Sequence, residues 1–173
     1  MRILTIGLGG AGCRIVDRLL AHDRKAPVHC VFGIVIDCDA EQLNSLQNVP
    51  VDQRIFFQPL DPSHPEDLAA HLPSEEALSR LQALDDGDID ALFVCAGLGG
   101  AMASTAPALV TFLKNSIAEP VFGLFTLPCR GEGEPRSSSA AEQLENLYGL
   151  LEGIVLYDNE SWYGKVPPAA DDT

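Results

Sequence analysis

Short apolar stretches alternate with stretches of helical periodicity along almost the whole chain. Several of the apolar stretches are continuous runs, as in "VFGIVID" and "ALFVCAG", which is typical of parallel strands covered on both faces. Helical spacing comes after them, as in the stripe formed by Ile15, Val16, Leu19 and Leu20. This order predicts an α/β fold with a doubly wound, mostly parallel six-stranded sheet and right-handed crossovers. Strands are expected at residues 2–8, 28–37, 54–60, 90–98, 121–128 and 153–159.

Local signals predict helix and domain boundaries. A break at Pro73 precedes a helical leucine pattern. Ser139 and Glu142 have the spacing of a capping box, which predicts that a helix begins at Ser139. Residues 164–173 are polar and contain paired prolines and acids, so we expect one domain over residues 1–163 followed by a tail or linker.

The charge balance argues against one class of partner. The formal net charge is −14, with 25 acidic against 11 basic residues. The basic residues form no stripe that could meet a phosphate backbone, so no nucleic-acid partner is expected. An acidic, lysine-poor surface is typical of a protein that works in high salt, although an ordinary acidic domain has the same balance.

Further patterns bear on the compartment and on metals. No uncharged apolar run is long enough to span a membrane and no signal-peptide pattern is present, so we expect a cytoplasmic protein. The five cysteines are isolated, without a C-x-x-C pair, which favours reduced thiols over a disulfide scaffold. The four histidines have no metal-ligand spacing with cysteines or carboxylates, so no metal ligand is predicted.

The first strand runs into a glycine loop over residues 7–12, the first glycine loop. Gly7, Gly9 and Gly12 form the G-x-G-x-x-G pattern of Rossmann-like nucleotide-binding folds, and Gly10 adds a further small residue. A helix that begins near Ala11 would direct its free N–H groups at a phosphate. A tight strand-to-helix turn without a ligand is the alternative.

Two acids come directly after the second strand. Asp37 or Asp39 could accept a hydrogen bond from a ribose hydroxyl, which is the arrangement of NAD-binding folds. Asp39 could equally be the N-cap of the next helix. These alternatives stay open on the sequence.

A second glycine loop, residues 97–105, comes after the fourth strand. Its glycines lead into a helix, and Ser104 and Thr105 add hydroxyl groups. Two glycine loops at the carboxyl edge of one sheet suit a chain of phosphates better than a pyrophosphate that joins two sugars. A Walker A motif is absent from the whole chain. Asn159, after the sixth strand, could read a base edge with its amide or serve as a turn residue.

Four motifs occur in a specific order: "IGLGGAG", "AGLGG", "LPCRGEG" and "YDNESW". Together they resemble the nucleotide-binding domain of the tubulin/FtsZ superfamily, and its archaeal CetZ branch in particular. The similarity extends over nearly all of residues 1–163. It implies a ligand of GTP or GDP, with Mg²⁺ as a companion ion, and head-to-tail assembly with a second copy or a paralogous protein.

The resemblance also implies roles for individual residues. Asp37 and Asp39 stand where the family's second loop approaches the nucleotide, Pro128 and Glu132 would line the ribose, and Asn159 would contact guanine. The first phosphate loop would comprise Gly9, Gly10, Ala11, Gly12 and Cys13, and the signature loop Gly99, Gly100, Ala101, Met102, Ala103, Ser104 and Thr105.

Three departures from the family pattern imply weak or absent GTP hydrolysis, with no catalytic residue assigned. Ala101, Met102 and Ala103 replace the Gly, Thr and Gly of the signature, and residues 59–76 lack the glycines of the third loop. The chain also stops before the long central helix and the catalytic loop that acts on the next subunit. Two alternatives remain, an NAD(P)-binding oxidoreductase domain and a tubulin-like interaction module that binds no nucleotide.

Overall fold

The computed structural model describes residues 1–59, 61, 64–85 and 89–162. The predicted tail, residues 164–173, lies outside the described residues. A single six-stranded sheet has the order β3-β2-β1-β4-β5-β6, and every neighbouring pair of strands is parallel. The predicted α/β class and doubly wound sheet are confirmed. The strands are β1 (Ile3–Leu8), β2 (Val31–Asp37), β3 (Arg54–Phe56), β4 (Ala91–Gly97), β5 (Val121–Leu127) and β6 (Gly153–Asp158).

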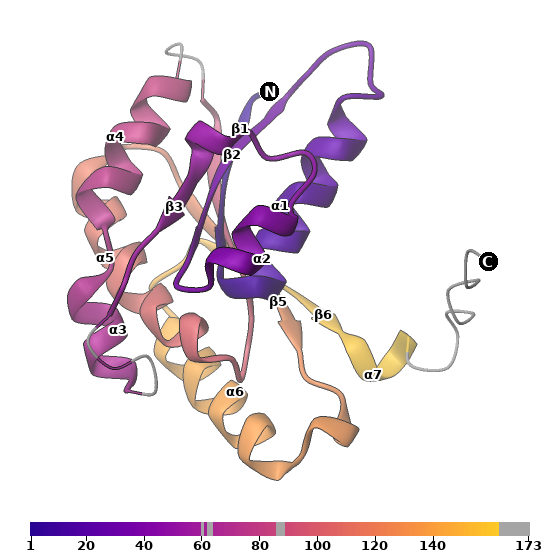
Figure 1. Cartoon of the computed structure of the whole chain (residues 1–173), viewed down its shortest axis with the longest axis vertical. Helices are drawn as coiled ribbons and strands as arrows, with labels where there is room; N and C mark the ends of the chain where they lie inside the picture. The colour runs from indigo at the N-terminus through magenta and orange to yellow at the C-terminus, as the bar shows by residue number, and fades with distance from the viewer. Residues whose placement is uncertain (60, 62–63, 86–88, 163–173) are drawn as a thin grey trace.

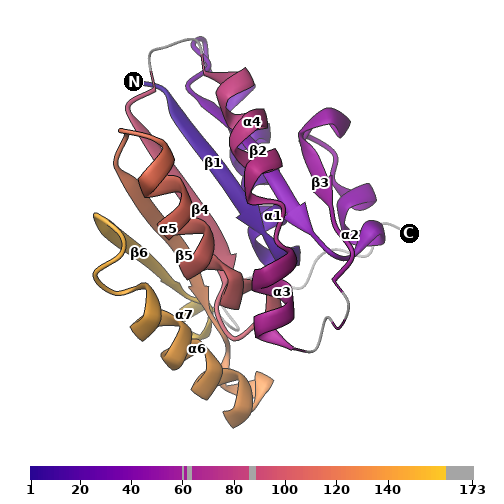
Figure 2. The same cartoon turned by 90° about the vertical axis from the view of Figure 1, so that its left-hand side faces the viewer.

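Helices cover the two faces of this sheet unequally. One face carries α1 (Gly9–Asp23) and the short α2 (Ala40–Ser45), as Figure 1 shows. Figure 2 shows the other face beneath α3 (Pro65–His71), α4 (Ser74–Leu84), α5 (Ala106–Ser116) and α6 (Glu134–Leu147). The described residues also form short elements: the 3₁₀ helices η1 (Val51–Gln53), η2 (Ala101–Thr105) and η3 (Arg130–Glu132), and the helix α7 (Asn159–Trp162).

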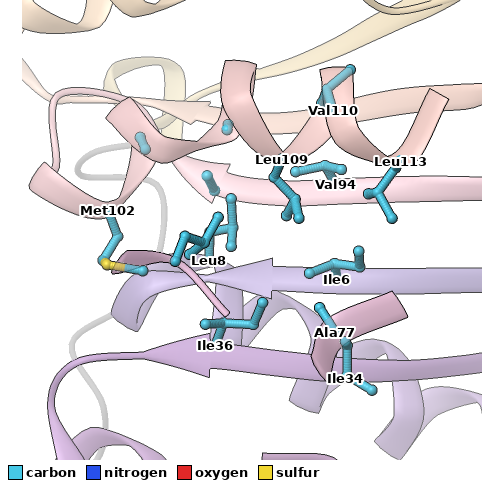
Figure 3. Packing of buried hydrophobic residues seen from close by; sticks show 14 of the residues in the cluster. Ile6, Leu8, Ile34, Ile36, Ala77, Val94, Met102, Leu109, Val110 and Leu113 are labelled. Atoms are coloured by element: carbon cyan, nitrogen blue, oxygen red, sulfur yellow. The ribbon is translucent and has the colours of Figure 1, made fainter. Parts of the chain in front are cut away.

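Strand alternation sends neighbouring residues into two separate cores. Ile34 and Ile36 of β2 pack toward α4 and α5, whereas Val35 between them packs beneath α1. Figure 3 shows Leu109 and Leu113 of α5 lying over the central strands in the first of these cores. Burial on both faces explains why these strands are continuous apolar runs.

Three predicted boundaries are wrong by three residues or more. The second strand begins at Val31 instead of residue 28. The third strand ends at Phe56 instead of residue 60. Ser139 lies inside α6, and the helix expected to begin there begins five residues earlier, at Glu134. Gly133, with φ of 93°, and Pro135 in the first turn fix the true start, because a left-handed glycine ends the preceding turn and proline fits the first helical positions.

On the face of the sheet that carries α1, strands β5 and β6 lie outside the area that α1 and α2 cover (Figure 1). Leu124 pairs with Val155 and Thr126 with Tyr157, and the two β6 side chains are 54% and 42% exposed. A groove of about 730 Å³ runs between these strands and the exposed side of α1, where Ile15 and Leu19 form part of its wall. Within the described ranges, no helix is both long and apolar enough to cross a membrane.

Candidate functional site

A cavity of about 500 Å³ opens at the carboxyl edge of the sheet. It lies where β1 adjoins both β2 and β4, the point at which the strand order reverses, and such crevices are the usual ligand sites of open α/β sheets. Many of the residues selected from the sequence line it: Gly9, Gly10, Ala11, Asp37, Gly100, Ala101, Met102, Ala103, Pro128, Glu132 and Asn159.

The first glycine loop ends in an open helix N-terminus. Gly9 has φ of 66°, a conformation that favours glycine, and α1 begins there, two residues before the expected start. The N-cap residue Leu8 provides no side-chain hydrogen bond, and the first turn contains no acid. The first N–H groups of a helix have no intrahelical acceptor, and here Gly9, Gly10 and Ala11 line the cavity. This arrangement favours an anion at the N-terminus of α1.

Gly12 and Cys13 face the sheet instead of the cavity. A Cβ atom on Gly12 would lie 2.2 Å from the carbonyl oxygen of Cys95, so this glycine allows α1 to approach β4. The thiol of Cys13 is buried, and its Sγ lies 3.8 Å from the carbonyl oxygen of Gly7. Burial raises the pKa of this thiol above its ordinary range, which keeps it protonated and unreactive.

The second glycine loop is occupied by hydrogen bonds within the protein. The N–H of Gly99 donates to Oε1 of Gln143 (2.7 Å), and the N–H of Gly100 donates to the carbonyl oxygen of Gly97 (3.3 Å). Gly99 has φ of 84°, and a Cβ there would lie 2.5 Å from the carbonyl oxygen of Arg136 in α6. Gly99 therefore packs against α6 and does not line the cavity.

Two hydroxyl groups of the second loop are also used locally. Ser104 donates to the carbonyl oxygen of Ala101 (2.6 Å) and Thr105 donates to that of Met102 (2.8 Å). Thr105 is fully buried, and neither side chain lines the cavity. The roles expected for Ser104 and Thr105 as ligand donors stay predictions, with no geometric support here.

Met102 joins the two loops. Its side chain is 7% exposed and belongs to the core that contains Leu8 and Ile36. In Figure 3 it extends from η2 toward β1 on the side of Leu8. A Cβ on Gly9 would meet the Cβ of Met102 at 2.7 Å, so the methionine lies directly against the first loop. Met102 thus supplies an apolar part of the cavity wall.

Asp37 is the unusual polar group of the site. It is 4% exposed, its Oδ1 accepts from the N–H of Asp39 (3.2 Å), and its buried Oδ2 has no hydrogen-bond partner among the described residues. Burial raises the pKa of this carboxyl group. A hydroxyl, an amine or a cation in the cavity would supply the missing partner.

Asp39 lies outside the cavity wall. Its Oδ1 accepts from the N–H groups of Glu41 (2.9 Å) and Gln42 (3.2 Å), so it is the N-cap of α2. This is the structural alternative that the sequence left open. Its expected contact with a ligand stays a prediction.

Glu132 and Asn159 come after β5 and β6, on the other side of β1 in the strand order from Asp37. Glu132 Oε1 accepts from the N–H of Cys129 (2.8 Å), and Oε2 pairs with Nη1 of Arg136 (3.2 Å). Asn159 is the first residue of α7. The carboxylate of Glu132 is therefore held in place before any ligand binds.

Sequence reasoning missed four polar residues that line the cavity: Arg14, Gln42, Thr126 and Arg136. Arg14 Nη1 donates to Gln42 Oε1 (3.0 Å) beside Gly10. The position of the arginines in the sequence could have indicated them. Each lies in the first two turns of a helix that comes after a strand of the parallel sheet, near the edge where the cavity opens.

The third-loop segment, residues 59–76, lies elsewhere. None of its described residues lines the cavity, and α3 packs against η2 with Leu68 in the core. In the part of the chain that the structure describes, no cluster of three or more His, Cys, Asp or Glu side chains has metal-binding geometry.

Comparison with known proteins places this geometry in a family context. The Tubulin/FtsZ family, GTPase domain, matches residues 2–167. The tubulin-like protein CetZ1 of Haloferax volcanii is 31% identical over 173 residues, covering 94% of this chain and 44% of CetZ1. CetZ4 of the same organism is 30% identical over 171 residues, covering 93% of this chain and 43% of CetZ4. The chain thus spans less than half the length of these relatives.

Solved structures show the same fold. The GDP-bound monomer of CetZ1 from Haloferax volcanii superposes with a TM-score of 0.84 at 27% identity, covering 94% of this chain and 52% of that one. A GTPγS-bound protofilament of CetZ2 gives a TM-score of 0.80 at 23% identity, covering 99% and 52%. An FtsZ dimer from M. jannaschii gives 0.71 at 25%, covering 98% and 48%. The family match argues against the alternative hypothesis of an NAD(P)-dependent oxidoreductase domain.

Proposed function

Because this chain belongs to the tubulin/FtsZ family and contains its GTPase domain, we propose that it binds guanine nucleotide, GTP or GDP, in the cavity at the carboxyl edge of the sheet. One observation carries the proposal. The uncapped N-terminus of α1 opens, through the left-handed Gly9, into a cavity that also contains the buried Oδ2 of Asp37. The first feature suits phosphate, and the second requires a donor or a cation.

The phosphates are proposed to bind at the first glycine loop. Gly9, Gly10 and Ala11 offer backbone N–H groups there, and Arg14 and Arg136 add positive charge to the cavity wall. Asp37 is the one buried acid on the described wall, so a phosphate nearby favours either protonation of this carboxyl group or a bridging Mg²⁺.

The nucleoside is proposed to extend toward β5 and β6. Pro128 and Glu132 would lie along the ribose, with Glu132 accepting from its hydroxyl groups, and Asn159 would contact the base. The ion pair between Glu132 and Arg136 links this end of the site to α6. The relatives' ligands support the choice of nucleotide, since CetZ1 was solved with GDP and CetZ2 with GTPγS.

Hydrolysis by this chain alone is proposed to be weak or absent. The N–H groups of Gly99 and Gly100 already have acceptors within the protein, and Met102 brings an apolar side chain to the cavity wall. Stabilising a γ-phosphate transition state needs donors aimed at the developing charge, and the second loop offers few of them. Assembly is proposed to be head-to-tail with a second copy or a longer paralogue, as the protofilament and dimer structures of relatives support.

The test is titration calorimetry of the purified protein in high salt, after removal of any bound nucleotide, with GTP, GDP, ATP and NAD. Binding of GTP and GDP alone is the expected result. Binding of NAD instead would overturn the proposal. Absence of binding to all four would favour the interaction module without nucleotide.

A further inference from the structure

Helix α6 contributes one side chain, Arg136, to the wall of the nucleotide cavity, and few of its own residues are buried. Of its residues Glu134–Leu147, only Ala140 and Leu147 are buried. Leu144 adds a partly buried contact with the core. A helix with so few fully buried residues has a low free energy of local opening. The polar contacts between α6 and the rest of the domain are therefore needed to hold the helix in position.

The strongest polar attachment is the side chain of Gln143. Its Oε1 accepts from the N–H of Gly99 (2.7 Å), and its Nε2 donates to the carbonyl oxygen of Gly100 (3.0 Å). One amide thus makes both of its hydrogen bonds to two successive residues of the second glycine loop. No sequence motif marks this glutamine, because its partners lie more than 40 positions earlier in the chain.

The first turn of α6 packs on the same loop. A Cβ on Gly99 would lie 2.5 Å from the carbonyl oxygen and 2.7 Å from Cγ of Arg136. Arg136 also lines the cavity and pairs with Glu132. Helix α6 therefore contacts the ligand cavity through Arg136 and the glycine loop through Gln143, two turns further along.

We propose that Gln143 is a positioning residue of the nucleotide site. It ties the second glycine loop to α6, so that Gly100 and the start of η2 keep their place in the cavity wall only while α6 is docked. Binding at the cavity must then stabilise the docking of α6, because coupling between two equilibria is reciprocal. This inference rests on the proposed binding of guanine nucleotide.

Two variants of Gln143 and one matched control test whether its hydrogen bonds to the second glycine loop affect nucleotide binding. Gln143→Leu removes both hydrogen bonds, whereas Gln143→Glu keeps an acceptor for the N–H of Gly99 and loses the donor to the oxygen of Gly100. Asn146→Leu makes the same amide-to-leucine change at an exposed position of the same helix, one that has no side-chain partner among the described residues. GDP affinity is measured by calorimetry and thermal stability by circular dichroism.

We expect Gln143→Leu to weaken GDP binding about tenfold, a usual size for coupling between sites. Gln143→Glu should lie between Gln143→Leu and the wild type, and Asn146→Leu should bind as the wild type does. Should Gln143→Leu fail to fold, the difference between Gln143→Glu and Asn146→Leu decides the question. Equal GDP affinity in all the folded variants overturns the inference.

Hydrogen exchange separates positioning from simple support of the fold. GDP should slow amide exchange along α6 in the wild type and in Asn146→Leu, and this protection should be largely lost in Gln143→Leu. Protection of α6 that is equal in all three proteins would overturn the coupling. Failure of the wild type to bind GDP contradicts the proposed function, whereas normal binding by Gln143→Leu contradicts only the role of Gln143.

Discussion

The same four residues, Gly-Leu-Gly-Gly, occur twice in this chain, at 7–10 and 97–100, and the two copies do different things. Both come at the end of a central strand, and in both the third residue has a left-handed φ, 66° at Gly9 and 84° at Gly99. The first copy leads into a 15-residue α-helix whose N-terminus is open. The second leads into a 3₁₀ helix, and its N–H groups are hydrogen-bonded within the protein.

The difference arises from the residues after each tetrapeptide and from the elements beside it. After the first, Gly12 lets α1 approach β4, so the helix N-terminus projects over the sheet edge. Beside the second, α6 supplies Gln143 and the backbone of Arg136. A glycine pattern thus indicates where another group can approach the backbone closely. The surrounding fold decides whether that group is a ligand or another helix.

The largest expected effect comes from Gly12→Val. The added Cβ would lie 2.2 Å from the carbonyl oxygen of Cys95, with backbone on both sides and no room to move. We expect a loss of about 3 kcal/mol or more in the free energy of unfolding, measured with urea. Gly131→Val is the control, because a Cβ there meets nothing within 4 Å. Similar stability of the two variants would show that α1 is not packed on β4 as described.

Gly10→Val should affect binding far more than stability. Its Cβ would contact only the side-chain ends of Gln42 (3.2 Å) and Arg14 (3.3 Å), which can move. The valine would crowd the N–H groups at the start of α1. We expect about a 100-fold loss of GDP affinity by calorimetry, the size of two lost hydrogen bonds to a charged group. Unchanged affinity in a folded variant would move the phosphate site away from the first loop.

Asp37→Asn tests the acid that faces the first loop. Burial raises the pKa of Asp37 in the folded state above the unfolded value of 3.8, so the folded state keeps this proton to higher pH. The contribution of Asp37 to the free energy of unfolding should therefore fall as pH rises from 3.8 through the raised pKa, so that the wild type loses stability relative to the variant. The variant should lack this fall and be more stable by about 1 kcal/mol at neutral pH. Urea unfolding across pH measures both, and a less stable variant would indicate a partner for Oδ2.

How far the sequence predicts this site depends on the range of each interaction. The sheet and the position of both glycine loops can be predicted from local pattern, since parallel strands end at one edge. Gln143 could not be predicted, because its role depends on contacts with residues more than 40 positions away. The helix start expected at Ser139 is wrong because a capping-box pattern can occur inside a helix, and here Gly133 and Pro135 set the start. Asp39 has two interpretations that only its hydrogen bonds distinguish.

The smallest expected effect is the one that most directly separates the two loops. Ser104 belongs to the segment that family resemblance assigns to phosphate, but its hydroxyl donates to the carbonyl oxygen of Ala101, and the side chain does not line the cavity. Ser104→Ala should therefore change GDP affinity by less than about twofold, within the usual range of a substitution away from a site. Gly10→Val, measured in parallel, shows that the assay detects a real loss. A tenfold loss of GDP affinity in Ser104→Ala would mean that this hydroxyl turns toward the bound nucleotide and that the second loop rearranges on binding.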